Sequence, residues 1–314
     1  MDLEATPTLA ERADWWRLGP GLVLLLTPAL VAITSWDAVR FSHPAYAMVL
    51  GLTASAGALL MWLGTRGSLR RSDRARILGR AVLVVLALAL SGIAWILRPA
   101  AATEVAIAAM ADGPDVAVTQ SATTILMRPV GEQRTTGLIF YPGGLVEPRA
   151  YANILRPLAA AGYPITIVKP PLGLAVFAAG TAGSIASPGD VVAGHSLGGV
   201  VAADAAADDA DLVGLVLWAS FPADNIAGRP NLATLSVFGS EDGLTTPAQV
   251  TESRSDLPAA TEFAEITGAV HSHFGDYGDQ AGDGTPTLSR ADAQAEIVAA
   301  TLALLDQVEA EAAP

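Results

Sequence analysis

Three long apolar runs, none of which contains a charged residue, lie within the first hundred positions of the chain. They are Leu18–Trp36, Pro44–Gly64 and Ala81–Leu97, and each is 17 to 21 residues long. A helix needs about 20 apolar residues to cross the hydrocarbon core of a bilayer. The pattern therefore predicts a membrane anchor in residues 1–98, with three transmembrane helices at about 18–36, 44–64 and 77–97.

The tryptophans favour the same interpretation, because indole rings gather at the headgroup level of a membrane. Five of the six lie at the ends of the runs, namely Trp15, Trp16, Trp36, Trp62 and Trp95. Core helices of a soluble domain explain neither this flanking nor the charged loops between the runs. A cleavable signal peptide has a short apolar region that ends in small residues, whereas the first run ends in Thr34-Ser35-Trp36-Asp37.

Charge divides the chain into two parts. The formal net charge is -13, yet residues 1–98 hold ten arginines and six acidic residues, a balance of +4, so the remainder carries -17. Six of those arginines lie in the loop Arg66–Arg80, and cytoplasmic loops of membrane proteins are enriched in such cations. We therefore expect the amino terminus and this loop in the cytoplasm, everything after Leu97 outside, and bilayer lipid as the partner of the anchor.

The pattern changes after residue 98. Residues 99–113 are rich in alanine and too short to span, which predicts a stalk or linker ending at Asp112-Gly113-Pro114. In residues 114–314, short apolar runs alternate with Ala-rich stretches. The predicted strands are Val116–Gln120, Thr124–Arg128, Leu138–Tyr141, Ile165–Lys169, Val191–Gly194, Val213–Trp218, Leu235–Phe238 and Glu262–Ile266; the predicted helices are Pro148–Ala161, Leu197–Ala207, Pro247–Ser255 and Ser289–Val308. This alternation predicts an α/β domain, a mostly parallel sheet with helices on both faces.

Composition excludes several classes of function. The acidic balance disfavours nucleic acid as a partner, since phosphate backbones need clustered cations. With no cysteine in the chain, disulfides, thiolate nucleophiles and cysteine metal sites are excluded. No His, Asp and Glu cluster has the spacing of metal ligands, and the Asp-rich segment GDYGDQAGDGTP lacks the spacing of a calcium loop. We expect neither metal nor cofactor, and a solvated turn at that segment.

One motif indicates the chemistry. Gly194-His195-Ser196-Leu197-Gly198 follows a predicted strand and opens a predicted helix of small residues. A G-x-S-x-G sequence in this context is typical of a nucleophile elbow, in which a sharp turn exposes the serine hydroxyl at the carboxyl end of the strand. The motif makes Ser196 the candidate nucleophile.

From about Asp115 the chain resembles the α/β-hydrolase superfamily, in its small, uncapped, dienelactone-hydrolase-like branch. The resemblance implies an acid after a late strand and then a histidine, in the chain order Ser, acid, His. Asp242 in LSVFGSEDGLTTP and His271 in ITGAVHSHFGDYGDQ occupy those places, with Glu241 as the alternative acid. Of the four histidines, His43 lies in a membrane loop and His195 in the elbow, which leaves His271 and His273; the resemblance favours His271.

An oxyanion hole needs two backbone N–H groups. The resemblance assigns one to Leu197 and the other to the Pro142-Gly143-Gly144 loop, from Gly144 or Leu145. A plain turn after a strand remains the alternative interpretation of this loop. Glu147 and His195 are the expected substrate-binding residues, although Glu147 equally fits an ordinary carboxylate at a helix amino terminus.

The leading hypothesis is a membrane-anchored serine hydrolase that cleaves an ester or related acyl bond through a Ser196-His271-Asp242 triad and an acyl-enzyme. Its substrate would be a small molecule or a lipid or cell-surface acyl compound, because the connection between Trp218 and Leu235 is too short for a cap domain. One alternative is acyl transfer by the same residues to an acceptor other than water. Another is a catalytically dead hydrolase fold that serves as a binding or sensor protein.

Overall fold

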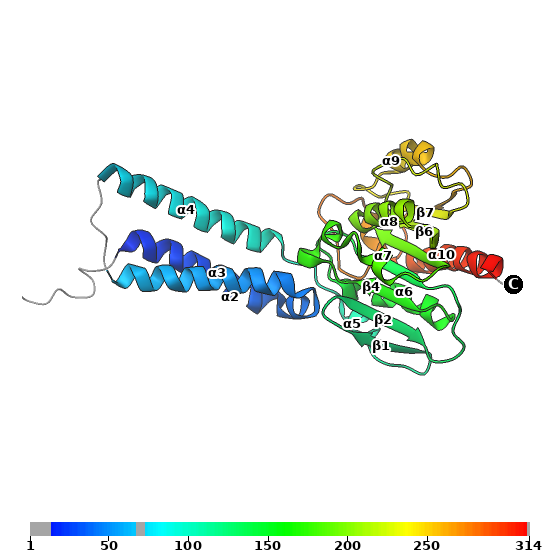
Figure 1. Ribbon diagram of the computed structural model, residues 1–314, viewed down its shortest axis with the longest axis horizontal. Coiled ribbons are helices and arrows are strands. Elements are labelled where there is room, and N and C mark those ends of the chain that lie inside the picture. The colour runs from blue at the N-terminus through cyan, green and yellow to red at the C-terminus, as the bar shows by residue number, and fades with distance from the viewer. Residues whose placement is uncertain (1–13, 67–72, 313–314) are drawn as a thin grey trace, which may run out of the picture. The chain divides into compact units, whose positions relative to one another are not determined.

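The computed structural model describes residues 14–66 and 73–312. These residues form two compact units that succeed one another after Arg98, except that residues 41–43 belong to the second. The first unit holds three long helices and the second an eight-stranded sheet (Figure 1). Residues 67–72, the centre of the Arg-rich loop that the predicted orientation depends on, lie outside the described residues.

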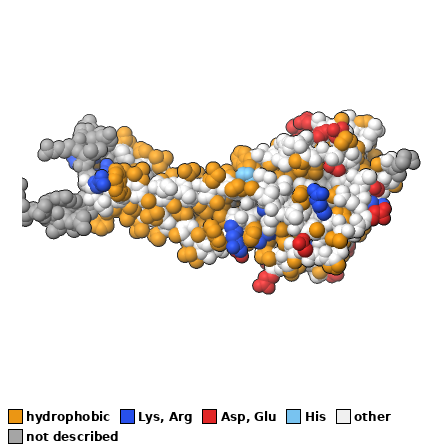
Figure 2. All heavy atoms as spheres, turned by 60° about the horizontal axis from the view of Figure 1, so that its bottom comes forward, with side chains coloured by type: hydrophobic (Ala, Val, Ile, Leu, Met, Phe, Trp, Pro, Cys, Tyr) orange, Lys and Arg blue, Asp and Glu red, His pale blue; other side chains and the backbone are white. Residues whose placement is uncertain are grey.

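The helices of the first unit are α2 (Trp15–Phe41), α3 (Pro44–Thr65) and α4 (Asp73–Ile96). Each contains a stretch long and apolar enough to cross a membrane: Trp15–Phe41, Pro44–Thr65 and Arg76–Ile96. Large apolar side chains on them face outward, among them Leu26, Leu52 and Leu88, which are 58%, 69% and 59% exposed. Figure 2 shows hydrophobic side chains spread over this part of the chain. Such a surface is compatible with surrounding lipid.

Glycines allow α2 and α3 to pack closely. A Cβ atom on Gly57 would lie 2.8 Å from the carbonyl oxygen of Gly21, and one on Gly21 would lie 3.0 Å from that of Gly57. Small residues at such crossings let two backbones approach, which is how helices associate in lipid. The Tyr46 hydroxyl of α3 donates a hydrogen bond of 2.5 Å to the carbonyl of Ala94 in α4.

The second unit is built on one sheet with the strand order β1-β2-β4-β3-β5-β6-β7-β8. The strands are β1 (Val116–Gln120), β2 (Thr124–Pro129), β3 (Leu138–Tyr141), β4 (Ile165–Val168), β5 (Asp190–His195), β6 (Leu212–Trp218), β7 (Ala233–Gly239) and β8 (Glu262–Ile266). The pairs β1–β2 and β2–β4 are antiparallel, and all other pairs are parallel. The prediction of a mostly parallel sheet is confirmed.

Two apolar layers cover the sheet because alternate side chains of each strand point to opposite faces. On β3, Leu138 and Phe140 join one layer, with α6 (Ala152–Ala160) and α10 (Arg290–Ala312). Ile139 and Tyr141 join the other, with α8 (Leu197–Asp208) and α7 (Thr181–Ile185). The central strands are therefore buried on both faces, and functional groups are restricted to the loops at the sheet edges.

The helices differ from the sequence-based expectation in three places. The predicted helix 148–161 is a 3₁₀ turn, η1 (Pro148–Tyr151), followed by α6. The predicted helix 247–255 is α9 (Pro247–Glu252) followed by a 3₁₀ turn. The connection from β4 to β5, for which the sequence predicted no helix, holds two 3₁₀ turns, η2 (Pro171–Gly173) and η3 (Ala175–Ala178), and then α7. Its Ala-, Gly- and Pro-rich composition carries no helical periodicity, so the pattern gives no signal there.

Residues 99–113, predicted as a stalk or linker, pack onto the rest of the second unit. The short helix α5 (Glu104–Ala108) buries Ala106, and Ala102 is also buried in the layer formed with α6. Ala100 pairs with Val146 in a parallel bridge, and the Ala102 N–H donates to Glu147 Oε2 at 2.9 Å. The alanines of this segment are small enough to pack closely against the domain.

Glu309 of α10 fixes the chain just before β3. Its carboxylate accepts hydrogen bonds from the N–H groups of Thr135 and Thr136 and from the Thr135 hydroxyl, at 2.9 to 3.1 Å. Burial alone would raise the pKa of Glu309, but these hydrogen bonds outweigh it and lower the pKa to about 2. Because the unfolded chain then binds more protons between pH 4.5 and pH 2, the stability that Glu309 contributes is complete above pH 4.5.

We expect Glu309→Gln to lower the melting temperature at neutral pH, and the deficit to shrink as the pH falls from 4.5 towards 2. The reason is that the wild-type carboxylate loses its charge over that interval. Thermal unfolding of the full chain in detergent at several pH values measures the deficit. Glu311→Gln on the same helix is the matched control, and a deficit that does not change with pH would contradict the prediction.

Candidate active site

Ser196 stands on a sharp turn between β5 and α8. Its backbone has φ 51° and ψ -124°, which is unfavourable for a residue with a side chain. A Cβ atom on Gly194 would overlap the backbone of Gly198, and one on Gly198 would overlap the carbonyl oxygen of Tyr141. Both positions therefore require glycine, as the sequence motif indicates. The turn leaves Ser196 partly exposed at the carboxyl end of β5, before the first turn of α8.

Neighbouring strands hold this turn in place. The Ser196 N–H donates to the carbonyl of Trp218 at 3.0 Å, and the Ser220 hydroxyl donates to the carbonyl of Ser196 at 2.7 Å. Both partners belong to β6 or the residues directly after it. Backbone strain of this kind persists only where surrounding contacts fix it, and these two hydrogen bonds supply such contacts.

Asp242 and His271 lie together at the same edge of the sheet. Asp242 follows β7, His271 follows β8, and Asp242 Oδ2 lies 2.9 Å from His271 Nδ1. Oδ1 of the same carboxylate accepts the N–H groups of Leu244 and Thr245 at 2.8 and 2.7 Å. Both members of the pair are buried, at 3% and 1% exposure, whereas the alternative acid Glu241 is exposed.

His271 also lies close to the elbow. Its ring centroid is 4.5 Å from that of His195, the residue directly before Ser196. Among the described residues, no hydrogen bond joins the Ser196 hydroxyl to the His271 ring. The alternative base His273 is buried, and its Nδ1 has no hydrogen-bond partner in residues 14–66 and 73–312. Of the two candidate histidines, His271 is the one that pairs with Asp242, the predicted acid.

The loop after β3 distinguishes between the two predicted oxyanion donors. The Leu145 N–H donates to the carbonyl of Gly173 at 2.7 Å, so this group is already engaged. Within the described chain, no hydrogen bond is formed by the Gly144 N–H or by the Leu197 N–H, which opens α8. Gly144 also lies against Leu197, since a Cβ at Gly144 would be 3.4 Å from Leu197 Cδ2. The geometry therefore favours Gly144 over Leu145.

Glu147 and His195 occupy different surroundings from those expected of substrate-binding residues. Each is 1% exposed. Glu147 forms a buried ion pair with Arg149 and accepts the N–H of Ala102, because burial of a carboxylate requires a charged or hydrogen-bonding partner. His195 Nδ1 lies 2.8 Å from the Tyr151 hydroxyl, which in turn accepts the Gly143 N–H at 2.9 Å. Both side chains face the protein interior.

Asp283 holds the loop that carries His271, a role the sequence did not reveal. Its Oδ1 accepts the N–H groups of His271 and Gly284 at 3.0 and 2.8 Å, and its Oδ2 accepts that of Ser272 at 2.8 Å. Burial tends to raise the pKa of Asp283, but these hydrogen bonds lower it overall. Asp283 lies in the Asp-rich segment predicted as a solvated turn, and nothing local to the sequence separates it from the other aspartates there.

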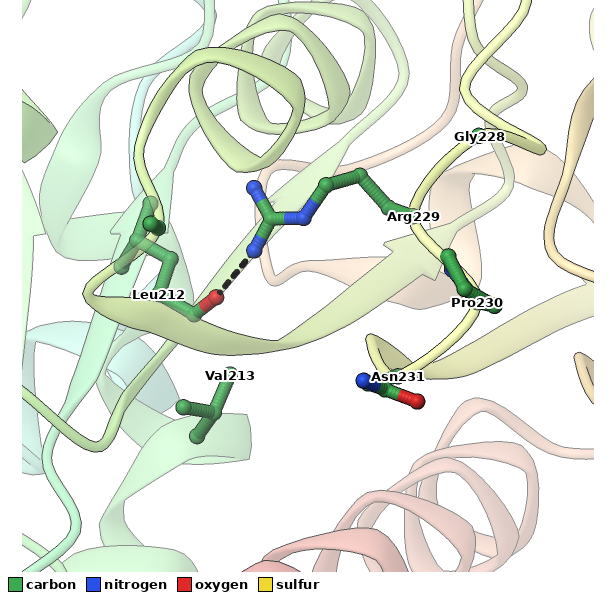
Figure 3. A pocket seen from close by; sticks show the side chains of 7 residues that line it. Leu212, Val213, Gly228, Arg229, Pro230 and Asn231 are labelled. Carbon is green, nitrogen blue, oxygen red and sulfur yellow. Dashed lines mark hydrogen bonds between the residues drawn. The ribbon is translucent and has the colours of Figure 1, made fainter.

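A hollow of about 260 Å³ lies at the end of β6 that is farther from the elbow, and it is lined by Leu212, Val213, Arg229 and Asn231 (Figure 3). The Arg229 guanidinium donates to the carbonyl groups of Leu212 and Asp209, both at 2.9 Å, and to those at the end of α8. Cations at a helix carboxyl terminus stabilise its unpaired carbonyl groups. Arg229 is thus used to end α8, and the hollow is remote from the elbow.

We expect Asp283→Ala to accelerate amide exchange at His271 and Ser272 by at least tenfold. Each N–H loses a hydrogen bond to a charged acceptor, and such bonds contribute about 1.5 to 3 kcal/mol. Hydrogen–deuterium exchange of peptides covering residues 268–275 measures the effect. Asp279→Ala, an exposed aspartate of the same segment, is the control. Equal exchange in the two variants would show that Asp283 does not fix this loop.

The chain is similar to one family profile and to several solved structures. The profile described as the alpha/beta hydrolase family matches residues 137–295, just over half of the chain. Among solved structures, a CIB-like hydrolase from Thermoplasma acidophilum is 16% identical, with a TM-score of 0.46 over 61% of this chain and 99% of that one. A hyperthermophilic esterase from Pyrobaculum calidifontis is 17% identical, with a TM-score of 0.47 over 65% and 88%.

A dienelactone hydrolase-like promiscuous phosphotriesterase from metagenomic libraries is 16% identical, with a TM-score of 0.45 over 62% of this chain and 96% of the other. No curated protein matches the sequence significantly. The match to the family profile begins just before β3 and extends into α10, so it includes the elbow and the loops after β3, β7 and β8. By this match, the chain belongs to the alpha/beta hydrolase family.

Proposed function

We propose that this protein is a membrane-anchored serine hydrolase that cleaves an ester or related acyl bond. The observation that carries the proposal is the buried Asp242–His271 pair, at 2.9 Å, beside a strained elbow that presents Ser196. A carboxylate that accepts the Nδ1 proton of histidine leaves Nε2 free to act as a base. Family membership supports hydrolase chemistry, and the triad assignment is our inference from the geometry.

The proposed reaction proceeds in two steps. The Ser196 hydroxyl oxygen attacks the acyl carbon while His271 Nε2 takes its proton, and the negative charge that develops on the carbonyl oxygen is stabilised by the N–H groups of Gly144 and Leu197. His271 then gives the proton to the leaving alcohol, and an acyl-enzyme remains. In the second step water attacks this ester while His271 takes its proton, and His271 then gives that proton to the Ser196 oxygen as the bond to the acyl carbon breaks and the acid is released.

The short connection after β6 favours a site that the substrate can reach directly. Among the described residues, 219–232 connect β6 to β7 without any helix or strand, so this connection holds no cap domain. The three apolar helices would keep the domain at a membrane surface. We therefore propose a small-molecule or a lipid or cell-surface acyl substrate. The positive-inside rule further assigns the Arg66–Arg80 loop to the cytoplasm and the hydrolase domain to the other side.

Replacing the nucleophile tests the chemistry. We expect Ser196→Ala to lower kcat/KM for p-nitrophenyl acetate by about 10³-fold or more, because the covalent step is lost while the fold is retained. Ser184→Ala, an exposed serine of α7, should retain wild-type activity. Purified full chain in detergent is the material for both assays. A fully active Ser196→Ala variant would refute the proposed mechanism.

The orientation has a separate test. A membrane-impermeant fluorophosphonate probe should label intact cells that express the wild-type chain but not those that express Ser196→Ala, since the activated serine would face outward. Labelling only after lysis would retain the hydrolase and reverse the topology. If neither intact nor lysed cells react, the catalytically inactive alternative would be favoured.

A further inference from the structure

The Tyr151 hydroxyl lies between a backbone group and a histidine ring in the interior of the domain. It accepts the Gly143 N–H at 2.9 Å and lies 2.8 Å from His195 Nδ1. Tyr151 is completely buried, and His195 is 1% exposed. Gly143 belongs to the loop after β3, Tyr151 to η1, and His195 is the last residue of β5. These contacts therefore connect the loop of the proposed oxyanion donor Gly144 to the elbow.

The partners of the Tyr151 oxygen indicate the protonation of this group of residues. Among the described residues its hydrogen-bond partners are the Gly143 N–H, which can only donate, and His195 Nδ1, so the phenol hydrogen has an acceptor only at Nδ1. A neutral His195 ring then carries its proton on Nε2, which is buried and has no hydrogen-bond partner within the described residues. Burial and the neighbouring His271 both hold the pKa of His195 well below its usual value, and burial raises the pKa of Tyr151. Both side chains are uncharged at neutral pH.

The space around these atoms is closely fitted. A Cβ atom on Gly143 would lie only 2.7 Å from His195 Nδ1 and 3.0 Å from the Tyr151 oxygen, so glycine is needed for the N–H to reach the phenol. The His195 ring stacks on Phe274 with an interplanar angle of 9° and a centroid distance of 5.8 Å. Because Phe274 and His271 belong to one 3₁₀ turn after β8, the His195 ring also contacts the loop of the proposed base.

We propose that Tyr151 and His195 form a neutral hydrogen-bonded relay that positions the oxyanion loop against the elbow and the His271 loop. The two are positioning residues, and the proposal rests on the serine-hydrolase function. By fixing Gly143, the relay aims the N–H of the next residue, Gly144, at the place where the oxyanion forms. By remaining neutral, His195 puts no second positive charge beside His271 when that ring takes the Ser196 proton.

The test compares three variants of the full chain in detergent on p-nitrophenyl acetate. Tyr151→Phe removes the hydroxyl and keeps the ring; we expect kcat to fall about tenfold or more with KM within twofold, since losing an oxyanion donor outright costs about 10² to 10³ in kcat. His195→Phe should show the same loss. His195→Asn places an amide oxygen near the site of Nδ1, so it should retain most of the wild-type kcat.

Tyr163→Phe is the matched control. Tyr163 is also completely buried, and its hydroxyl donates to Asp306 at 2.6 Å on α10, outside the relay. Each kcat is expressed per serine titrated by a fluorophosphonate, and the melting temperature of each variant is recorded. We expect Tyr163→Phe to retain kcat even where its melting temperature falls as far as that of Tyr151→Phe.

Several outcomes would overturn the relay. They are a wild-type kcat in Tyr151→Phe, an equal loss of kcat in Tyr163→Phe, or a His195→Asn variant as impaired as His195→Phe, which would indicate proton transfer by His195 itself. Nitrogen-15 spectra of histidine-labelled protein give a readout besides activity. The wild-type chain should show His195 as the Nε2–H tautomer and Tyr151→Phe should not, whereas an active Ser196→Ala variant would refute the hydrolase mechanism without altering this signal.

Discussion

The contact between the elbow and the end of β3 determines how the nucleophile lies against the loop after β3. Gly198 lies so close to the carbonyl oxygens of Tyr141 and Pro142 that no side chain fits between them. Because β3 and β5 are neighbouring parallel strands, this contact carries the loop after β3 over the first turn of α8. Gly144 then rests against Leu197, and Gly143 against His195. One glycine contact thus brings together the nucleophile, both proposed oxyanion donors and the relay.

The sequence was sufficient for the parts of the fold that have a local pattern. All eight strands appear within two residues of their predicted ends, since each is a short apolar run bounded by turn residues. The elbow was equally readable, because its glycines and serine are adjacent in the chain. The packing of residues 99–113 has no local pattern in the sequence: their alanines look alike whether they face water or pack on α6, and only the tertiary contact of Ala106 decides.

The candidate site shows the same limit. The sequence left Gly144 and Leu145 open because the choice depends on Gly173, which lies in a connection without periodicity and accepts the Leu145 N–H. Tyr151 was missed because its partner His195 is 44 residues away in the chain. Asp283 was missed because the N–H groups that it accepts, those of Ser272 and His271, are 11 and 12 residues away. Glu147 and His195 were expected to contact substrate because Glu147 follows the glycine loop after β3 and His195 lies within the elbow motif. Both side chains instead lie in the interior, and the spacing of residues along the sequence does not reveal which of them are buried.

Two residues, Asp283 and His195, support the loop of His271, and they lie at different depths in the domain. Asp283 lies partly exposed, where water offsets the penalty for its charge, and it accepts four N–H groups that a neutral side chain could not satisfy so strongly. His195 lies in the interior, where an isolated charge is costly, and its contacts are made by a neutral ring. If His195 carried a charge, it would oppose protonation of His271, whose ring lies 4.5 Å away. The partly exposed carboxylate of Asp283 and the buried, neutral ring of His195 therefore hold the same loop, and neither opposes the proton transfer proposed for His271.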